Sequence, residues 1–114
     1  MLRGTTLTIL AMLVSATAAY ADPIQGNWRT PHGDTAAIAS CGSGFCISLK
    51  TGRFKGKSIG SMNANGGNQY SGSITDPETD KTYSGNATLL GSSLRLQGCV
   101  LGGLICKGQT WSKI

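Results

Sequence analysis

The sequence has few of the residues that enzymes use for acid–base and nucleophilic chemistry. Its 114 residues include one His and five acidic residues, and charged residues make up 13% of the chain. The single histidine, His32, stands beside Pro31 and Gly33, but no Gly-x-Ser-x-Gly motif supplies a nucleophilic serine for it. We therefore interpret His32 as a loop residue and expect a protein that is not an enzyme. A His32-dependent hydrolase is the least favoured alternative.

Metal-binding signatures are also missing from the sequence. The four cysteines show neither the Cys-x-x-Cys spacing of redox motifs nor the spacing of zinc ligands. Asp76, Glu78 and Asp80 alternate along one polar stretch, but Pro77 interrupts them, and the Gly and distant Glu of a calcium-binding loop are absent. We interpret these acidic residues as a turn, and we expect no metal and no cofactor.

The one long apolar run lies near the N-terminus. Arg3 precedes the apolar residues 7–19, and the small-residue pattern Ala-Tyr-Ala that follows is typical of a signal-peptidase site. The run is shorter than the about 20 residues of a membrane-spanning helix. The pattern predicts a signal peptide over residues 1–21, with an uncleaved anchor as the alternative. We expect a periplasmic or secreted domain of residues 22–114 with no transmembrane segment after processing, and export makes nucleic acid a poor partner.

The apolar residues follow the period of β-strands. No apolar pattern with a helical period of 3.6 persists for two turns, and short alternating runs are separated by breaks rich in Gly, Asn, Ser and Asp. This pattern predicts an all-β fold with eight antiparallel strands near residues 24–30, 35–41, 45–50, 57–63, 69–75, 82–90, 93–101 and 104–113. Because no long crossover separates the hairpins, we expect a small up-and-down barrel, with a two-sheet sandwich as the alternative.

Two-residue turns predict which residues of the last three strands face one another. The turn at residues 91–92 predicts four pairs on one face, namely Leu89 with Leu94, Ala87 with Leu96, Gly85 with Gly98 and Tyr83 with Val100. The turn at residues 102–103 adds two pairs, Val100 with Ile105 and Leu94 with Trp111. We expect this apolar face to line the barrel interior.

The same reasoning pairs the four cysteines. The last hairpin sets Cys99 opposite Cys106, and a turn at residues 43–44 sets Cys41 opposite Cys46. Directly opposed strand residues have Cα atoms about 4.5 to 5.5 Å apart, which a disulfide can bridge. We therefore predict the disulfides Cys41–Cys46 and Cys99–Cys106, both on the outer face, over the other two connectivities.

The last hairpin also points two polar side chains toward the interior. Lys107 and Gln109 fall opposite inward-facing positions of the preceding strand. Burial of a lysine is unfavourable, so either a bulge turns Lys107 out to solvent or Lys107 lies at a barrel mouth. At a barrel mouth, Lys107 would be a polar contact for an anionic ligand such as a fatty-acid carboxylate. We add Tyr70 and Tyr83 as further candidate ligand contacts.

Four basic residues lie close together around Phe54, and they are Lys50, Arg53, Lys55 and Lys57. No acidic residue lies among them, so the cluster is a candidate contact for an anionic envelope surface such as lipid A or anionic lipid. The alternative is a solvated loop that keeps the protein soluble.

Several motifs spread over residues 22–114 resemble a known family. They are Asp22-Pro23-Ile24 with Gly26-Asn27-Trp28, Cys41-Gly42 with Phe45-Cys46, Ile74 with Asp76-Pro77 and Lys81-Thr82-Tyr83-Ser84, Leu94 to Cys99, and Gln109-Thr110-Trp111. The chain resembles the exported bacterial proteins grouped as domain of unknown function 2147, which are similar to the calycin, or lipocalin-like, barrels. The resemblance implies a small barrel, export and no assigned activity.

The calycin resemblance also implies how the barrel closes. In calycins an Arg near the last strand covers the Trp of the first strand, and here Lys113 would stack on Trp28 as a less planar cation. We count Trp111 among the barrel-closing residues. Leu49 and Thr75 stand where members of the family often carry aromatic residues.

These patterns predict an exported β-barrel that binds a small apolar or amphiphilic ligand without catalysis. The alternative is a filled barrel that acts through its loops or outer face as an envelope structural or protein-interaction module. Room for a ligand depends on small inward residues, which are Ala36, Gly72, Gly85, Ala87 and Gly98. The oligomeric state is left open.

Overall fold

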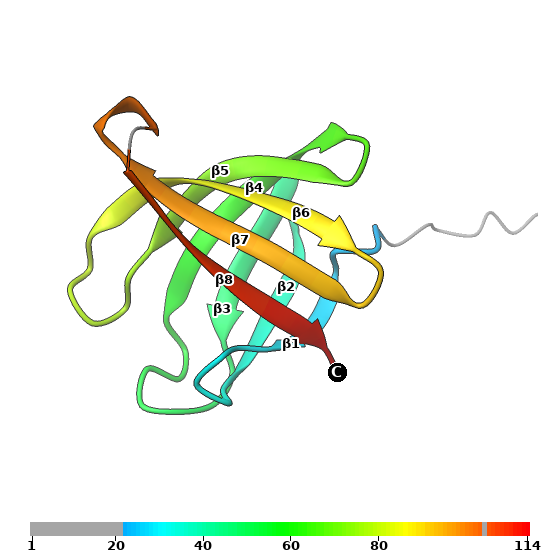
Figure 1. The fold of residues 1–114 in the computed structure, drawn as a ribbon. Coiled ribbons are helices and arrows are strands. Elements are labelled where there is room, and N and C mark those ends of the chain that lie inside the picture. The colour runs from blue at the N-terminus through cyan, green and yellow to red at the C-terminus, as the bar shows by residue number, and fades with distance from the viewer. Residues whose placement is uncertain (1–21, 104) are drawn as a thin grey trace, which may run out of the picture.

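The protein forms a closed antiparallel β-barrel in which each strand pairs with the next and the last strand returns to the first (Figure 1). This computed structural model describes residues 22–103 and 105–114, so the predicted signal peptide lies outside the described residues. The elements are β1 (Gly26–Arg29), β2 (Thr35–Cys41), β3 (Gly44–Leu49), β4 (Ser58–Gly66), β5 (Gln69–Thr75), β6 (Thr82–Leu90), β7 (Ser93–Val100), the 3-10 helix η1 (Leu101–Gly103) and β8 (Ile105–Lys113). The predicted barrel is confirmed. Among these elements, no helix has the length and apolar character needed to cross a membrane.

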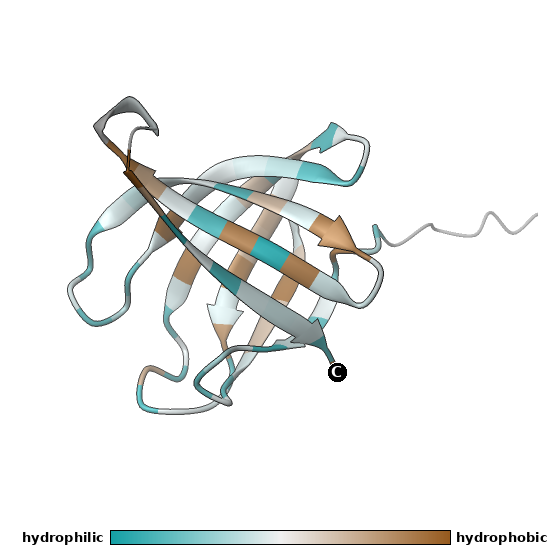
Figure 2. Cartoon of the chain, in the orientation of Figure 1, coloured by the Kyte–Doolittle hydropathy of each residue, from teal (hydrophilic) through white to brown (hydrophobic). Residues whose placement is uncertain are grey.

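The interior of the barrel is built from alternate residues of the strands. Apolar and polar positions alternate along β7, as Figure 2 shows by its bands of brown and teal. The buried core consists of Ile24, Trp28, Ala36, Ile38, Ile47, Leu49, Ile59, Met62, Tyr70, Ala87, Leu89, Leu94, Leu96 and Trp111. Because successive strand side chains point to opposite faces, the period-2 pattern places most of these side chains on one face, which closure of the sheet buries. Two of them depart from this pattern, because Ile24 precedes β1 and Ile59 lies at a β-bulge between β3 and β4.

The predicted register of the last three strands is confirmed. Strand β6 pairs Leu89 with Leu94, and β7 pairs Leu94 with Trp111. The ladder between β6 and β7 ends at Ser84 and Cys99, so the predicted pair of Tyr83 and Val100 is not formed.

Both predicted disulfides form, but the predicted register of the second hairpin is wrong. The turn lies at residues 42–43, so Cys41 pairs with Gly44 and Cys46 with Ala39. Gly42 opens this turn with φ of +58°, a left-handed conformation that glycine adopts without steric cost. Cys41 and Cys46 are therefore diagonal neighbours, with Cα atoms 5.8 Å apart, whereas Cys99 and Cys106 are directly opposed with Cα atoms 4.1 Å apart.

The connections divide the barrel into two different ends (Figure 1). The tight turns at residues 42–43, 67–68 and 91–92 lie at one end, which we call the closed end. The longer connections at residues 30–34, 50–57 and 76–81, together with η1, lie at the other, which we call the open end. The strands alternate in direction, so every second connection must fall at the same end.

The segment that precedes β1 plugs the closed end. Ile24 is fully buried, and its carbonyl oxygen accepts a hydrogen bond of 2.9 Å from the indole Nε1 of Trp28. The ammonium group of Lys113 lies 4.7 Å from the Trp28 ring centroid and donates to the carbonyl oxygen of Gln25 at 2.6 Å. Gly26 leaves room for this contact, because a Cβ there would lie 2.8 Å from Lys113 Nζ. The expected stacking of Lys113 on Trp28 is present.

Candidate functional site

A cavity of about 760 Å³ occupies the open end of the barrel. Its apolar wall is formed by Leu49, Phe54, Ile59, Ile74, Leu96 and Trp111. Its charged and titratable rim is formed by His32, Asp34, Arg53, Asp76, Glu78 and Lys107. This volume falls within the range of roughly 300 to 1,000 Å³ that is typical of small-molecule sites. The barrel is therefore filled at its closed end and hollow at its open end.

A row of inward-facing glycines explains part of this space. Gly72, Gly85 and Gly98 are successive cross-strand partners on β5, β6 and β7, and the row continues to Lys107 on β8. A Cβ at Gly85 would lie 2.6 Å from Ile74, so a neighbouring side chain already occupies that space. A Cβ at Gly98 would meet only Tyr83 carbons, at 3.6 and 3.9 Å. The missing side chain at position 98 therefore contributes open volume to the cavity.

Lys107 and Gln109 lie on the inner face of β8 beside this cavity. The register between β7 and β8 is continuous from Val100–Ile105 to Ser93–Ser112, so the predicted alternative of a bulge at Lys107 is wrong. Both side chains line the cavity, and both residues are exposed. The side-chain oxygen of Gln109 accepts a 2.8 Å hydrogen bond from Trp111 Nε1, which orients the amide at the cavity wall.

The structure brings only one of the two candidate tyrosines to the cavity. Tyr83 is half-buried and lines the wall. Tyr70 lies at the closed end, where its hydroxyl group donates a 2.5 Å hydrogen bond to Asp22 Oδ1. Burial, followed by the hydrogen bond and charge of Asp22, raises the pKa of Tyr70 far above its ordinary value. Trp111 lines the cavity, whereas Trp28 and Lys113 lie at the closed end.

A buried hydroxyl group in the cavity wall lacks a partner. Thr30 follows β1 and lines the cavity, and its Oγ1 has no hydrogen-bond partner within the part of the chain that the structure describes. An unsatisfied buried hydroxyl group costs about 1 to 3 kcal/mol of stability. A polar group of a bound ligand would relieve this cost. No sequence motif indicates this feature, because it depends on the fold around Thr30.

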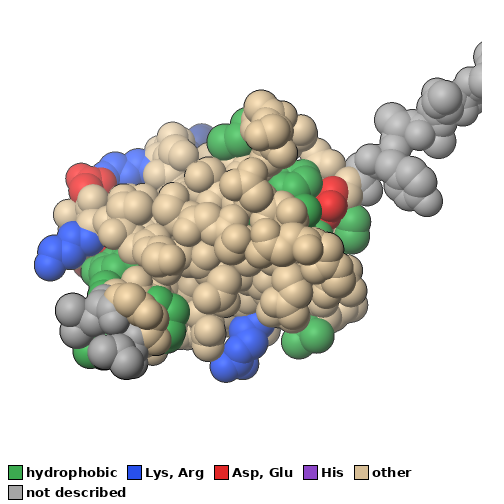
Figure 3. Space-filling model, turned by 90° about the horizontal axis from the view of Figure 1, so that it is seen from above, with side chains coloured by type: hydrophobic (Ala, Val, Ile, Leu, Met, Phe, Trp, Pro, Cys, Tyr) green, Lys and Arg blue, Asp and Glu red, His purple; other side chains and the backbone are tan. Residues whose placement is uncertain are grey.

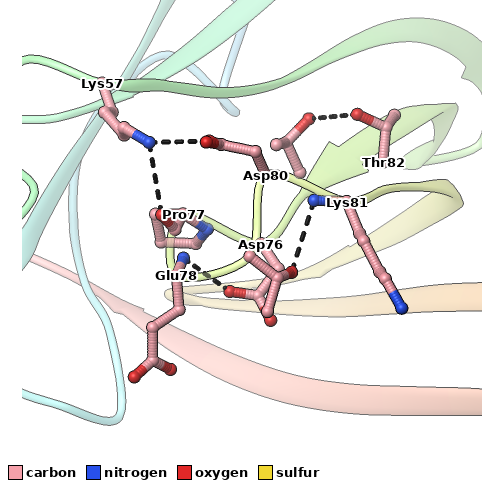
Figure 4. A network of polar contacts seen from close by, with 9 residues as sticks. Lys57, Asp76, Pro77, Glu78, Asp80, Lys81 and Thr82 are labelled. Atoms are coloured by element: carbon pink, nitrogen blue, oxygen red, sulfur yellow. Dashed lines mark hydrogen bonds and ion pairs between the residues drawn. The ribbon is translucent and has the colours of Figure 1, made fainter.

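The basic cluster and the acidic turn meet across the rim of the cavity. Lys57 Nζ lies 2.6 Å from Asp80 Oδ1 and donates to the carbonyl oxygen of Pro77 at 3.3 Å (Figure 4). Arg53 forms a longer ion pair of 4.0 Å with Glu78. Figure 3 shows acidic and basic side chains side by side at one end of a largely uncharged face. Two of the four basic residues are thus paired, which reduces the positive field expected from the sequence.

Phe54 is a cavity residue that we did not expect from the sequence. It packs against the buried core from the connection between β3 and β4 and forms part of the cavity wall. The cations of Arg53 and Lys57 lie 5.0 and 5.8 Å from its ring centroid. The spacing of Phe54 between two basic residues is a sequence signal for a cation–π cluster, but only the fold places Phe54 at the cavity.

The structure places His32 at the rim and offers no metal centre among residues 22–103 and 105–114. No group of three or more His, Cys, Asp and Glu side chains there could hold a metal ion. His32 is exposed in the connection between β1 and β2, across from the charged residues of the other loops.

Comparison with known proteins gives one finding. The model of a family described as "Uncharacterized protein conserved in bacteria (DUF2147)" matches residues 48–113, which are more than half of the chain. No curated protein and no solved structure matches the chain. The matched segment contains β4 to β8, and with them Gly98, Lys107, Gln109 and most of the cavity wall.

Proposed function

This chain belongs to the bacterial family DUF2147, and we propose that it is an exported, non-catalytic protein that holds a small amphiphilic ligand in the cavity at its open end. The observation that carries the proposal is the cavity itself, which combines an apolar wall with a polar rim. An apolar chain would lie against Leu96 and Trp111, and an anionic head group would lie beside Lys107.

The relative size of the two interactions indicates which part of the ligand supplies affinity. Burial of each methylene group contributes about 0.8 kcal/mol. An ion pair with an exposed lysine contributes about 0 to 1 kcal/mol, because water screens it. Lys107 would therefore orient the ligand, while the apolar wall would supply most of the binding free energy. The unpaired hydroxyl group of Thr30 offers a second polar contact in the wall.

Export is supported by the two disulfides of this bacterial chain. Disulfides persist in oxidising compartments and are rare in the reducing cytoplasm. The predicted signal peptide over residues 1–21 agrees with this, and the periplasm or the extracellular medium is the proposed location. Because Arg53 and Lys57 are engaged by acidic residues, the basic cluster fits a solvated rim better than a contact for an anionic envelope surface.

The cavity can be tested by filling it. The purified protein is titrated with dodecanoate, and binding is followed by native mass spectrometry and calorimetry. Gly98→Leu places a side chain into the open volume and is expected to abolish binding, whereas Asn86→Leu, on the outer face of β6, is expected to preserve it. Circular dichroism checks that both variants keep the β-sheet signal. Equal binding by the folded Gly98→Leu variant and the wild type would exclude this cavity as the ligand site.

A further inference from the structure

The last strand extends beyond its partner on one side. Strand β8 pairs with β7 from Ile105 to Ser112, but with β1 only through Trp28–Lys113 and Arg29–Ser112. Figure 1 shows β8 continuing past the short β1 toward the open end. Within the described residues, no strand lies along the β1 side of residues 106–110, which we call the β8 edge. The junction between β1 and β8 is therefore paired toward the closed end of the barrel and has a gap toward the open end.

The hydrogen bonds at the closed end show which backbone groups face this gap. Lys113 N donates to Ser92 O on the β7 side, whereas Ile114 N donates to Asn27 O on the β1 side. Backbone groups alternate in direction along an antiparallel strand, so the even-numbered residues of β8 face β1. Cys106, Gly108 and Thr110 therefore each present one N–H and one C=O group to the gap. Such a row of unpaired groups is a template for an additional strand.

The gap adjoins the cavity. On one side of the gap lie Thr30 and His32 of the connection after β1, and on the other lie Lys107 and Gly108, and all four line the cavity. In a strand added to the β8 edge, alternate side chains would point inward toward this apolar wall, and the others would point outward. Inward positions of an added strand therefore favour apolar residues.

The charges around the gap are mainly positive. Arg29 pairs with Ser112, and Arg95 pairs with Thr110, so two exposed arginines flank β8 on its outer face. Lys107 adds a third positive charge on the inner side. Asp34, in the connection across the gap, offsets one of these positive charges. Outward positions of an added strand therefore favour acidic residues.

We propose that the β8 edge binds an extended peptide segment of another protein in which acidic residues alternate with apolar ones. Main-chain hydrogen bonds to Cys106, Gly108 and Thr110 give affinity, and the flanking arginines and the cavity select the side chains. A second copy of this chain fits the edge less well, because antiparallel pairing of two β8 edges would place the Lys107 cations of both copies on the same face of the new strand pair. The proposal does not depend on an amphiphilic ligand, since the unpaired backbone groups lie outside the apolar wall.

The probe is a synthetic peptide of three alternating Glu-Val pairs with blocked ends, and its control has the same composition with the three Glu residues before the three Val residues. Hydrogen exchange measured by NMR follows individual amides. We expect the alternating peptide to protect the amides of Cys106, Gly108 and Thr110, whereas the amides of Lys107 and Gln109 already face β7 and change little.

Gly108→Pro is the decisive variant, because it removes a donor that faces the gap and leaves the ladder with β7 intact. We expect about tenfold weaker peptide binding in this variant and unchanged binding in Gly108→Ala, which keeps the N–H group. Arg95→Glu provides a second test that spares the backbone and is also expected to weaken binding.

Three results would overturn the proposal. The first is that the amides of the β8 edge stay unprotected at saturating peptide. The second is that the Gly108→Pro and Gly108→Ala variants bind the peptide equally and Arg95→Glu binds it as the wild type does. The third is that dimerisation protects the edge amides in the absence of peptide. Dodecanoate retention is a separate readout, so loss of ligand binding in the cavity leaves this test unaffected.

Discussion

Lys113 covers the indole ring of Trp28 from the far end of the chain, with its ammonium group 4.7 Å from the ring centroid. The same group donates to Pro23 O at 3.3 Å and to Gln25 O at 2.6 Å. One side chain of β8 thus ties together β1 and the segment before it. The contact closes the barrel where β1 and β8 share few backbone pairs.

Replacement of Lys113 is expected to lower the free energy of unfolding. Lys113→Met removes the cation over Trp28 and its donors to the two carbonyl oxygens, and we expect a loss of about 1 to 2 kcal/mol. Lys113→Arg keeps a cation that can stack on the ring and is expected to stay close to the wild type. Urea denaturation at neutral pH measures both variants. A Met variant as stable as the wild type would contradict this role.

The contact between Tyr70 and Asp22 predicts a loss of stability at high pH. Burial and Asp22 raise the pKa of Tyr70 in the folded state above the value of about 10 for an unfolded chain. The protonated tyrosine therefore contributes its full stabilisation below about pH 10, and this contribution decreases as the pH rises above that value. Tyr70→Phe is expected to reduce the pH dependence measured between pH 9 and 11, whereas Tyr83→Phe serves as the control and should retain it.

The unpartnered hydroxyl group of Thr30 predicts a stabilising substitution. Thr30→Val keeps the shape of the side chain and removes a buried group without a hydrogen-bond partner among the described residues, so we expect a gain of about 1 kcal/mol. Thr51 provides the contrast, because its Oγ1 accepts a 2.8 Å hydrogen bond from Thr35 N, and Thr51→Val should destabilise the protein. Thermal unfolding in the absence of ligand compares the two. A destabilised Thr30→Val variant would show that this hydroxyl group is satisfied in solution.

The ion pair between Lys57 and Asp80 is expected to contribute little and to depend on salt. Asp80 has φ of +61°, which Asn also tolerates, so Asp80→Asn removes the charge and preserves the backbone. We expect a loss of at most about 1 kcal/mol at low ionic strength, which disappears in about 1 M NaCl. Lys55→Met, in the same connection, is the control and should have no effect. A larger loss of stability that persists in about 1 M NaCl would contradict the assignment of a weak, screened ion pair to Lys57 and Asp80.

The sequence predicts the barrel well because its signals are local. Alternating residues and glycine-containing turns determine the register of β6, β7 and β8, and this register correctly pairs Cys99 with Cys106. The error at the second hairpin has a physical reason. Moving its turn from residues 43–44 to 42–43 shifts the pairing by two residues, which keeps every side chain on the same face. The hydrophobic pattern therefore cannot distinguish the two registers.

The cavity rim was less predictable because distant segments form it. Lys57 and Asp80, which meet beside this rim, are 23 positions apart, and the same holds at the closed end, where Tyr70 and Asp22 are 48 positions apart. No local pattern indicates that these groups meet. The gap beside β8 likewise results from the difference in length between two strands at opposite ends of the chain. For Lys107 the nearby turn predicts a position opposite an inward-facing residue, but the sequence left open a bulge that would turn it outward, and only the continuous ladder with β7 excludes this.

The described chain begins and finishes at the same end of the barrel, with Asp22 held by Tyr70 and Ile114 bonded to Asn27. A tether attached at either extremity would therefore leave the opposite end facing solution. Immobilisation on a sensor through a C-terminal linker should keep both the hollow interior and the β8 edge accessible. The same geometry would direct them away from any surface to which the protein is anchored.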